Sequence, residues 1–216
     1  MPIFQKNLDN FGLILRGRSI EKIRLAANKF EDFIIVNNFD KEVGATGKYL
    51  QGKRGVQLVN MELTAKCERK NYELLGIKDI MFSRREKKGH RMAPIGPYRQ
   101  LGLRVHFTPD EVWKCLKDYP NADKRKKFPN TGMLGFSYCV YYLAPKNLWI
   151  VGLDFYHADY LFRRSHQTVW EVQRRRTDSN QLVEVFVKTV KKNPNINFHM
   201  VTYCEVLPNL PNLEIL

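Results

Sequence analysis

The segment from Phe11 to Val36, FGLILRGRSIEKIRLAANKFEDFIIV, decides the fold of this chain. It holds two short apolar runs, FGLIL at 11–15 and FIIV at 33–36, on either side of a helix-like pattern from Ile20 to Phe30. Short, continuous apolar strands separated by helices are typical of a parallel sheet that is covered on both faces. The segment therefore predicts two buried parallel strands joined by a helix.

The same alternation continues along the rest of the chain. Four more apolar runs predict strands at 56–59, 77–82, 148–153 and 198–203, and helical spacing appears at 108–116, 132–144 and 181–190. The pattern predicts an α/β, Rossmann-like fold, with a mostly parallel sheet and helices on both faces. A length of 216 residues favours a single domain, 1–216, in which 83–100 and 155–166 are loop or lid segments.

The composition of the chain excludes disorder and suggests an anionic partner. Hydrophobic residues make up 44% of the chain and charged residues 27%, which is ordinary for a globular protein. Lys and Arg number 36 against 22 Asp and Glu, and the net charge is +14. Nucleic acid, an anionic membrane surface and a phosphorylated substrate all fit this charge. The basic segments 83–100 and 121–127 are either solvated loops or an acceptor platform.

Neither a secretory signal nor a membrane span is visible in the sequence. The longest nearly apolar run, 133–144, is well short of the roughly 20 residues that cross a bilayer. The four cysteines show no CxxC pair and no His at metal spacing, so we expect four reduced thiols and no metal site. We expect a cytoplasmic protein, with peripheral contact at the inner face of an anionic membrane as one use of its charge.

Polar residues follow most of the predicted strands, where a parallel sheet binds ligands. Asn and Asp are also common turn formers, which is the alternative explanation for each of them. The candidates at these strand ends are Gly17, Arg18, Ser19, Asn37, Asn60, Asp154, Tyr156 and His157.

The sequence 129–132, Pro-Asn-Thr-Gly, opens an apolar helix and is a candidate phosphate cradle. Helix N-terminal amides favour anions, and glycine permits close backbone approach. An ordinary helix start is the alternative. Gly17-Arg18-Ser19 is a second candidate anion site, whereas the GxGxxG fingerprint and the P-loop are absent.

His166 is the candidate general base. It follows Ser165, which is placed to cap a helix that runs to about Arg175, and a His at a helix start stays neutral at pH 7, as a base requires. A structural His is the alternative. Glu171, five residues on, would not pair with it directly on a regular helix.

Several of these segments resemble the motifs of sialyltransferases that use CMP-sialic acid. The sequence 128–160, FPNTGMLGFSYCVYYLAPKNLWIVGLDFYHADY, is similar to the family's small motif, and its GLDFY is especially similar to the bacterial lipooligosaccharide enzymes. The His-x4-Glu spacing of His166 and Glu171 matches the very small motif of the eukaryotic enzymes. LILRGRSIEKI followed by FIIVNNF is similar to the large motif.

The resemblance implies a GT-A-like domain that catalyses a metal-independent, inverting glycosyl transfer without a cofactor. The donor would be a CMP-activated sialic acid or related nonulosonate, and the acceptor a hydroxyl of a glycan or glycolipid. No nucleic-acid partner is expected. In this reading His166 is the base and Tyr156, with Tyr160, steadies the leaving phosphate. The donor would contact Gly17, Arg18, Ser19, Asn37, Asn60, Asn130, Thr131, Gly132, Gly152, Asp154 and His157.

The chain departs from the family pattern at three places. Arg18 stands where the families carry Asn, Asn130 replaces a Ser or Thr, and the stretch 156–166 is shorter than the bacterial lid. Two alternatives stay open, a transferase that uses CMP-Kdo and a non-catalytic basic protein that binds nucleic acid. The second lacks a helix-turn-helix, RNP or zinc-knuckle signature. Acceptor, linkage and oligomeric state are left open.

Overall fold

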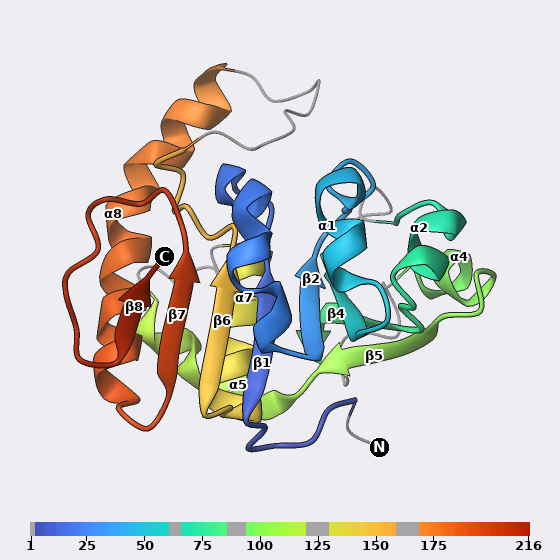
Figure 1. The fold of residues 1–216 in the computed structure, drawn as a ribbon, viewed down its shortest axis with the longest axis horizontal. Helices are drawn as coiled ribbons and strands as arrows, with labels where there is room; N and C mark the ends of the chain where they lie inside the picture. The colour runs from blue at the N-terminus through green and yellow to red at the C-terminus, as the bar shows by residue number, and fades with distance from the viewer. Residues whose placement is uncertain (1–2, 61–65, 86–93, 120–129, 159–168) are drawn as a thin grey trace.

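The computed structural model of the protein describes residues 3–60, 66–85, 94–119, 130–158 and 169–216 (Figure 1). For residues 85, 118 and 169–178 it describes the backbone only. Of the predicted site residues, Tyr160 and His166 lie outside the described residues, and so do the basic segment 121–127 and residues 86–93 of the segment 83–100.

The described residues form one eight-stranded sheet in which every pairing between strands is parallel. The strand order is β5-β4-β3-β2-β1-β6-β7-β8. The predicted α/β, Rossmann-like fold is therefore confirmed. The strands are β1 (Asn10–Ile14), β2 (Asp32–Val36), β3 (Arg54–Val59), β4 (Asp79–Arg85), β5 (Arg104–Thr108), β6 (Asn147–Val151), β7 (Asn197–Val201) and β8 (Leu213–Ile215).

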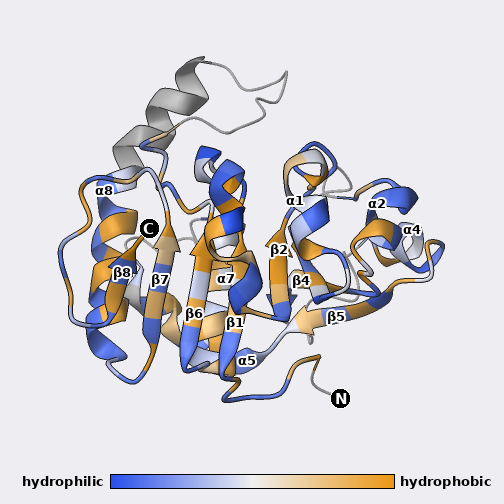
Figure 2. Ribbon diagram, in the orientation of Figure 1, coloured by the Kyte–Doolittle hydropathy of each residue, from blue (hydrophilic) through white to orange (hydrophobic). Residues whose placement is uncertain are grey.

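Helices cover both faces of this sheet because successive side chains of a strand point to opposite faces. Leu13 of β1 packs into the core beneath α5, α7 and α8, whereas Ile14 packs into the core beneath η1, α1, α2 and α4. Figure 2 shows the resulting apolar strands between helices with polar outer surfaces. The helices are η1 (Arg18–Leu25), η2 (Ala27–Lys29), α1 (Val43–Leu50), α2 (Arg69–Leu74), α4 (Ile95–Arg99), α5 (Asp110–Trp113), η4 (Lys114–Asp118), α7 (Thr131–Tyr138), η5 (Cys139–Leu143) and α8 (Val169–Lys192).

The segment predicted as a helix from Ile20 to Phe30 is a pair of 3-10 helices, η1 and η2, and not an α-helix. Its buried apolar residues Ile20, Ile23 and Ala26 recur every third position. A 3-10 helix has three residues per turn, so this spacing keeps all three side chains on the face that packs against the sheet. The helix-like pattern predicted from the sequence is therefore present as two 3-10 helices.

The described part of the chain contains no helix that is long and apolar enough to cross a membrane. All four cysteines are buried and none forms a disulfide. Burial raises the pKa of the Cys67 and Cys139 thiols, so both remain protonated at neutral pH. These thiols are packing groups of the core.

Candidate functional site

The candidate site lies where the strand order reverses, at the carboxyl ends of β1, β2 and β6. From β1 the chain builds the sheet outward through β2 to β5, and then returns to place β6 on the other side of β1. In open α/β sheets the crevice at such a switch point is the usual place for a ligand. The predicted residues Gly17, Asn37 and Gly152 follow these three strands.

Two glycines let the ends of β1 and β6 approach closely. The Gly17 amide donates to the Gly152 carbonyl at 2.9 Å, and a Cβ on Gly17 would lie 2.5 Å from that oxygen. Gly152 has a φ of +81°, and a Cβ there would lie 2.3 Å from the carbonyl oxygen of Leu15. No residue with a side chain fits either position without moving backbone.

Asp154 ties together the segments around this close approach. Its side chain is buried, with 3% of the residue exposed. The carboxylate accepts hydrogen bonds from the backbone N–H (2.9 Å) and hydroxyl (2.6 Å) of Ser19, the hydroxyl of Thr202 (3.1 Å) and the backbone N–H of Tyr203 (3.0 Å). The described contacts of Asp154 therefore bind η1 and the end of β7 to the end of β6. A contact of Ser19 or Asp154 with the donor remains a prediction.

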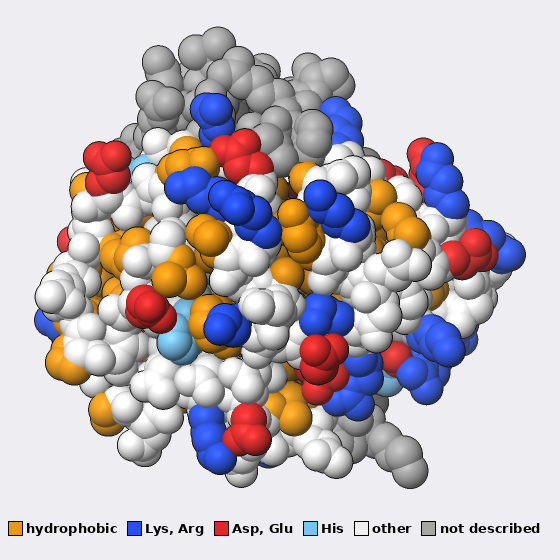
Figure 3. Space-filling model, in the orientation of Figure 1, with side chains coloured by type: hydrophobic (Ala, Val, Ile, Leu, Met, Phe, Trp, Pro, Cys, Tyr) orange, Lys and Arg blue, Asp and Glu red, His pale blue; other side chains and the backbone are white. Residues whose placement is uncertain are grey.

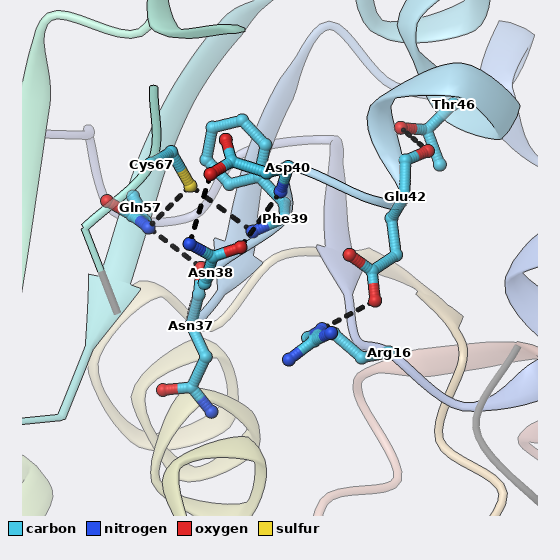
Figure 4. Close-up of polar contacts among 9 residues, drawn as sticks. All are labelled: Arg16, Asn37, Asn38, Phe39, Asp40, Glu42, Thr46, Gln57 and Cys67. Carbon is cyan, nitrogen blue, oxygen red and sulfur yellow. Dashed lines mark hydrogen bonds and ion pairs between the residues drawn. The ribbon is translucent and has the colours of Figure 1, made fainter. Parts of the chain in front are cut away.

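Asn37, directly after β2, combines an unusual backbone conformation with a buried polar side-chain atom. It has a φ of +61°, its backbone N–H donates to Leu58 and its carbonyl accepts from Gln57. Its side-chain oxygen is buried and has no hydrogen-bond partner among the described residues. Figure 4 shows the carboxamide directed away from Asn38, Phe39 and its other labelled neighbours. A left-handed backbone and an unpaired buried oxygen both cost stability, which is typical of a functional position.

The loop on the other side of Asn37 is anchored by side chains. Asn38 donates to Asp40 at 3.2 Å, and the Phe39 amide donates to the Cys67 sulfur at 3.2 Å (Figure 4). Asp40 also accepts from the Asn71 side chain at 2.7 Å. These contacts hold the backbone of the loop, so the unusual conformation of Asn37 is fixed before any ligand arrives.

The N-terminus of α7 lies at the same edge. The Asn130 side chain caps this helix by accepting from the Met133 amide at 2.8 Å, and its NH₂ group donates to the Tyr156 hydroxyl at 3.2 Å. Gly132 packs against Leu15, so close that a Cβ on it would lie 2.5 Å from the Leu15 side chain. The first-turn amides of Thr131 and Gly132 have no carbonyl partner within the helix and favour an anion.

Tyr156 stands on a tight turn after β6. Phe155 and Tyr156 both have positive φ, 47° and 65°, and the His157 amide donates to the Asp154 carbonyl at 2.8 Å. The exposed His157 side chain lies 2.9 Å from the Ser179 hydroxyl on α8. Two consecutive left-handed residues cost free energy, and here they turn Tyr156 back toward Asn130.

The structure does not bring every predicted residue into this group. Arg18 begins η1 with an exposed side chain, 3.8 Å from Glu21. Asn60 follows β3 and is half-buried, but residues 61–65 after it lie outside the described residues. In the part of the chain that the structure describes, no three His, Cys, Asp or Glu side chains are grouped as metal ligands would be.

One residue at the switch point was not singled out from the sequence. Arg16 follows β1, and its Nε donates to Glu42 at 2.6 Å (Figure 4). The side chain of Arg16 is 11% exposed and that of Glu42 is fully buried. The signal in the sequence was a basic residue directly after a buried strand. The prediction instead named Arg18, two residues further on, as a contact of the donor.

Two solved structures that are similar to this chain in fold are sialyltransferases. One is the sialyltransferase CstII from Campylobacter jejuni in complex with a substrate analogue, cytidine-5′-monophosphate, with a TM-score of 0.56 and 15% sequence identity over 97% of this chain and 86% of that one. A second is a variant of CstII in complex with CMP, with a TM-score of 0.54 and 15% identity over 93% and 87%. No family model and no curated protein matches the sequence. The resemblance predicted from the sequence is confirmed in the fold.

Proposed function

We propose that this protein is a sialyltransferase-type glycosyltransferase that takes its sugar from a CMP-activated donor. The observation that carries the proposal is the buried, unpaired side-chain oxygen of Asn37 at the switch point, near the N-terminus of α7. A nucleoside offers N–H and O–H donors for that oxygen, and the helix N-terminus favours a phosphate. A CMP donor carries both groups. The likeness of the whole fold to two CMP-bound sialyltransferase structures supports the same choice.

The proposed chemistry is a single displacement at the anomeric carbon. An acceptor hydroxyl forms the new C–O bond while the bond to the phosphate breaks, and CMP leaves with the electron pair. His166 takes the hydroxyl proton. Tyr156 and Tyr160 donate hydrogen bonds to the phosphate as its charge grows, which needs no metal. The attack from the opposite face inverts the anomeric centre.

The contacts of Tyr156 support this proposed role. Its hydroxyl oxygen accepts from Asn130, which orients the O–H as a donor, and Asn130 is itself fixed as the cap of α7. The proposed phosphate donors, the Tyr156 hydroxyl and the first-turn amides of α7, are therefore linked through one side chain. We propose that Gly17 and Gly152 contribute by backbone approach, and Ser19 and Asp154 by holding η1 in place.

A thermal-shift screen with CMP, UDP, GDP and S-adenosylmethionine tests the proposal. A ligand at a hundred times its Kd adds about 2.7 kcal/mol of stability. We expect stabilisation by CMP at millimolar concentration and none by the other three. Stabilisation by another nucleotide without any by CMP would overturn the donor assignment. Competition between CMP-sialic acid and CMP-Kdo then separates the two sugar classes, because both share the cytidine site.

Nucleic-acid binding is the competing function, and the net charge of +14 favours it. On the face shown in Figure 3, Lys and Arg side chains lie in several separate groups, with Asp or Glu beside most of them. A nucleic-acid footprint is a continuous basic patch or stripe. Binding of DNA or RNA that weakens steeply with salt would support this alternative.

Replacing Asn37 by glycine is expected to weaken CMP binding without lowering stability. Glycine adopts a φ of +61° freely, and the change removes a buried oxygen that has no partner among the described residues. The lost hydrogen bond to the ligand should raise the Kd about 5- to 100-fold. Calorimetric titration with CMP and thermal denaturation measure the two effects.

Asn7→Gly is the matched control for that variant. Asn7 also has a positive φ, 59°, but it precedes β1 and is exposed. We expect the Asn7→Gly variant to bind CMP with unchanged affinity. If Asn37→Gly lowered the melting temperature and kept the affinity, Asn37 would be a structural turn residue.

Replacing Tyr156 by phenylalanine is expected to lower kcat about 10- to 1,000-fold and to change KM much less. The hydroxyl stabilises charge that appears mainly in the transition state, so the ground state loses little. Steady-state kinetics with a CMP-activated donor measure both constants. Tyr203→Phe is the control. Tyr203 follows β7, and the change removes a tyrosine hydroxyl that donates to the exposed side chain of Glu21 in η1. An effect on KM alone would make Tyr156 a ground-state binding residue.

A further inference from the structure

Arg16 and Glu42 form a buried ion pair beside the candidate site. The Nε of Arg16 donates to Oε1 of Glu42 at 2.6 Å. Glu42 directly precedes α1, and its carbonyl accepts from the backbone N–H (3.0 Å) and the hydroxyl (2.9 Å) of Thr46. The backbone of Glu42 is therefore held at the start of α1, and its carboxylate holds one edge of the guanidinium.

The pair uses only one edge of the guanidinium. Arginine carries five N–H donors, and the usual structural pairing with a carboxylate engages two of them in parallel. In the described part of the chain, Nε is the one side-chain nitrogen of Arg16 that forms a hydrogen bond. The Arg16 side chain is 11% exposed. Figure 4 shows the outer end of the guanidinium turned away from Glu42. The Nη groups thus lie on the side of the guanidinium that Glu42 does not engage.

The sheet places Arg16 and Asn37 just beyond the ends of two neighbouring strands. The register between β1 and β2 pairs Ile14 with Ile35, so Arg16 and Asn37 each stand two residues beyond the last pair. Neighbouring strands are about 4.8 Å apart. The guanidinium of Arg16 and the side-chain oxygen of Asn37, which is buried without a hydrogen-bond partner among the described residues, therefore belong to neighbouring strand ends. The guanidinium of Arg16 can donate hydrogen bonds to an anion, and the side-chain oxygen of Asn37 can accept a hydrogen bond from a neutral polar group.

Packing alone gives a poor account of this pair. Removing two charges from water costs several times the energy of an ordinary hydrogen bond, and an apolar pair of similar volume would be about as stable. Arg54 illustrates the structural arrangement at the amino end of the sheet. There the guanidinium holds Asp32 through both Nε and Nη2, at 2.6 and 2.9 Å, and 56% of the side chain is exposed.

We propose that Arg16 binds an oxyanion of the donor through its Nη edge, and that Glu42 is the positioning residue that aims it. The inference rests on the proposed function. A CMP-activated nonulosonate carries two oxyanions, the phosphate and the sugar carboxylate, and both match the planar guanidinium fork. Arg16 would thereby select donors that carry an anion at this position of the site.

The test compares the wild type with Arg16→Lys and with the double variant Arg16→Gln/Glu42→Gln. Lysine keeps the charge but loses the fork, and the double variant removes both charges together so that none is left buried and unpaired. Calorimetry measures the affinity for CMP and for cytidine, and kinetics measure KM for CMP-sialic acid. Arg54→Lys is the matched control.

If the phosphate is the oxyanion, both variants should bind CMP about 10- to 150-fold more weakly and cytidine with unchanged affinity. If the sugar carboxylate is the oxyanion, the affinities for CMP and for cytidine should stay the same, and KM for CMP-sialic acid should rise by a similar factor. Folded variants with unchanged affinity and KM would overturn the inference while leaving the proposed function intact. A wild-type protein that binds neither CMP nor cytidine would overturn the proposed function, and the inference with it.

The role of Glu42 is tested by a double-mutant cycle. Glu42→Gln should reduce the ratio of CMP to cytidine affinity when Arg16 is present, and should have no further effect on that ratio beside Arg16→Gln. A merely structural Glu42 would lower stability in both backgrounds without changing the ratio.

Discussion

Replacing His166 by alanine is expected to lower the rate of sugar transfer by about 100- to 10,000-fold, the usual contribution of a positioned general base, while CMP affinity stays nearly the same. The assignment rests on the His-x4-Glu spacing with Glu171 and on the place of His166 just before α8 in the sequence. The first turns of α8 stand beyond the carboxyl ends of the strands (Figure 1). Single-turnover kinetics and CMP titration measure the two quantities.

His157 is the rival base and provides the control. Its ring lies 2.9 Å from the Ser179 hydroxyl, a contact that ties the turn after β6 to α8. We expect His157→Ala to keep most of the activity. The pH profile separates the two residues, because a general base makes kcat/KM fall at acid pH, near pH 6.5 for an ordinary His. If His157→Ala removed that fall and His166→Ala kept it, the assignment of the base would be wrong.

Replacing Asp154 by alanine is expected to cost about 3–5 kcal/mol of stability, an unusually large effect for one substitution. The change leaves the Ser19 amide and hydroxyl and the Tyr203 amide without the carboxylate to which they donate. Urea denaturation measures the free energy of unfolding, and a fall of roughly 10 °C in Tm should accompany the loss.

Asp9→Ala is the control for that substitution. Asp9 forms an exposed ion pair with Lys146 at 2.7 Å, and such pairs contribute at most about 1 kcal/mol. If Asp154→Ala lost under 1 kcal/mol of stability and still weakened CMP binding strongly, Asp154 would be a direct ligand of the donor.

The central strands could be predicted from sequence because they are buried on both faces. FIIV at 33–36 and LWIV at 148–151 contain no charged residue, which is typical of strands that are covered on both faces. β5, RVHFT, was missed because it is an edge strand in which Arg104 is exposed and His106 is half-buried, so its apolar run is broken. β8 has three residues, too few for any pattern.

For the candidate site, the sequence could predict the places of residues that depend only on their position along the chain. Asn37 and Asn130 were identified because one follows a strand and the other opens a helix. The pairing of Arg16 with Glu42 depends on how α1 packs against the end of β1, and no local spacing encodes that contact. The ties of Asp154 to Ser19 and Tyr203 likewise join segments from the two ends of the chain.

The central place of β1 also bears on how the protein is made. β1 pairs on one side with β2, its near neighbour in sequence, but on the other side Asn10 pairs with Asn147 of β6. During synthesis that second edge stays unpaired until well over half of the chain has left the ribosome, and parallel pairings between distant segments form slowly. An apolar strand edge that stays unpaired during synthesis is prone to associate with other chains. We therefore expect the yield of folded protein to depend strongly on translation speed and on the supply of chaperones. The stability of the folded protein alone would not predict this yield.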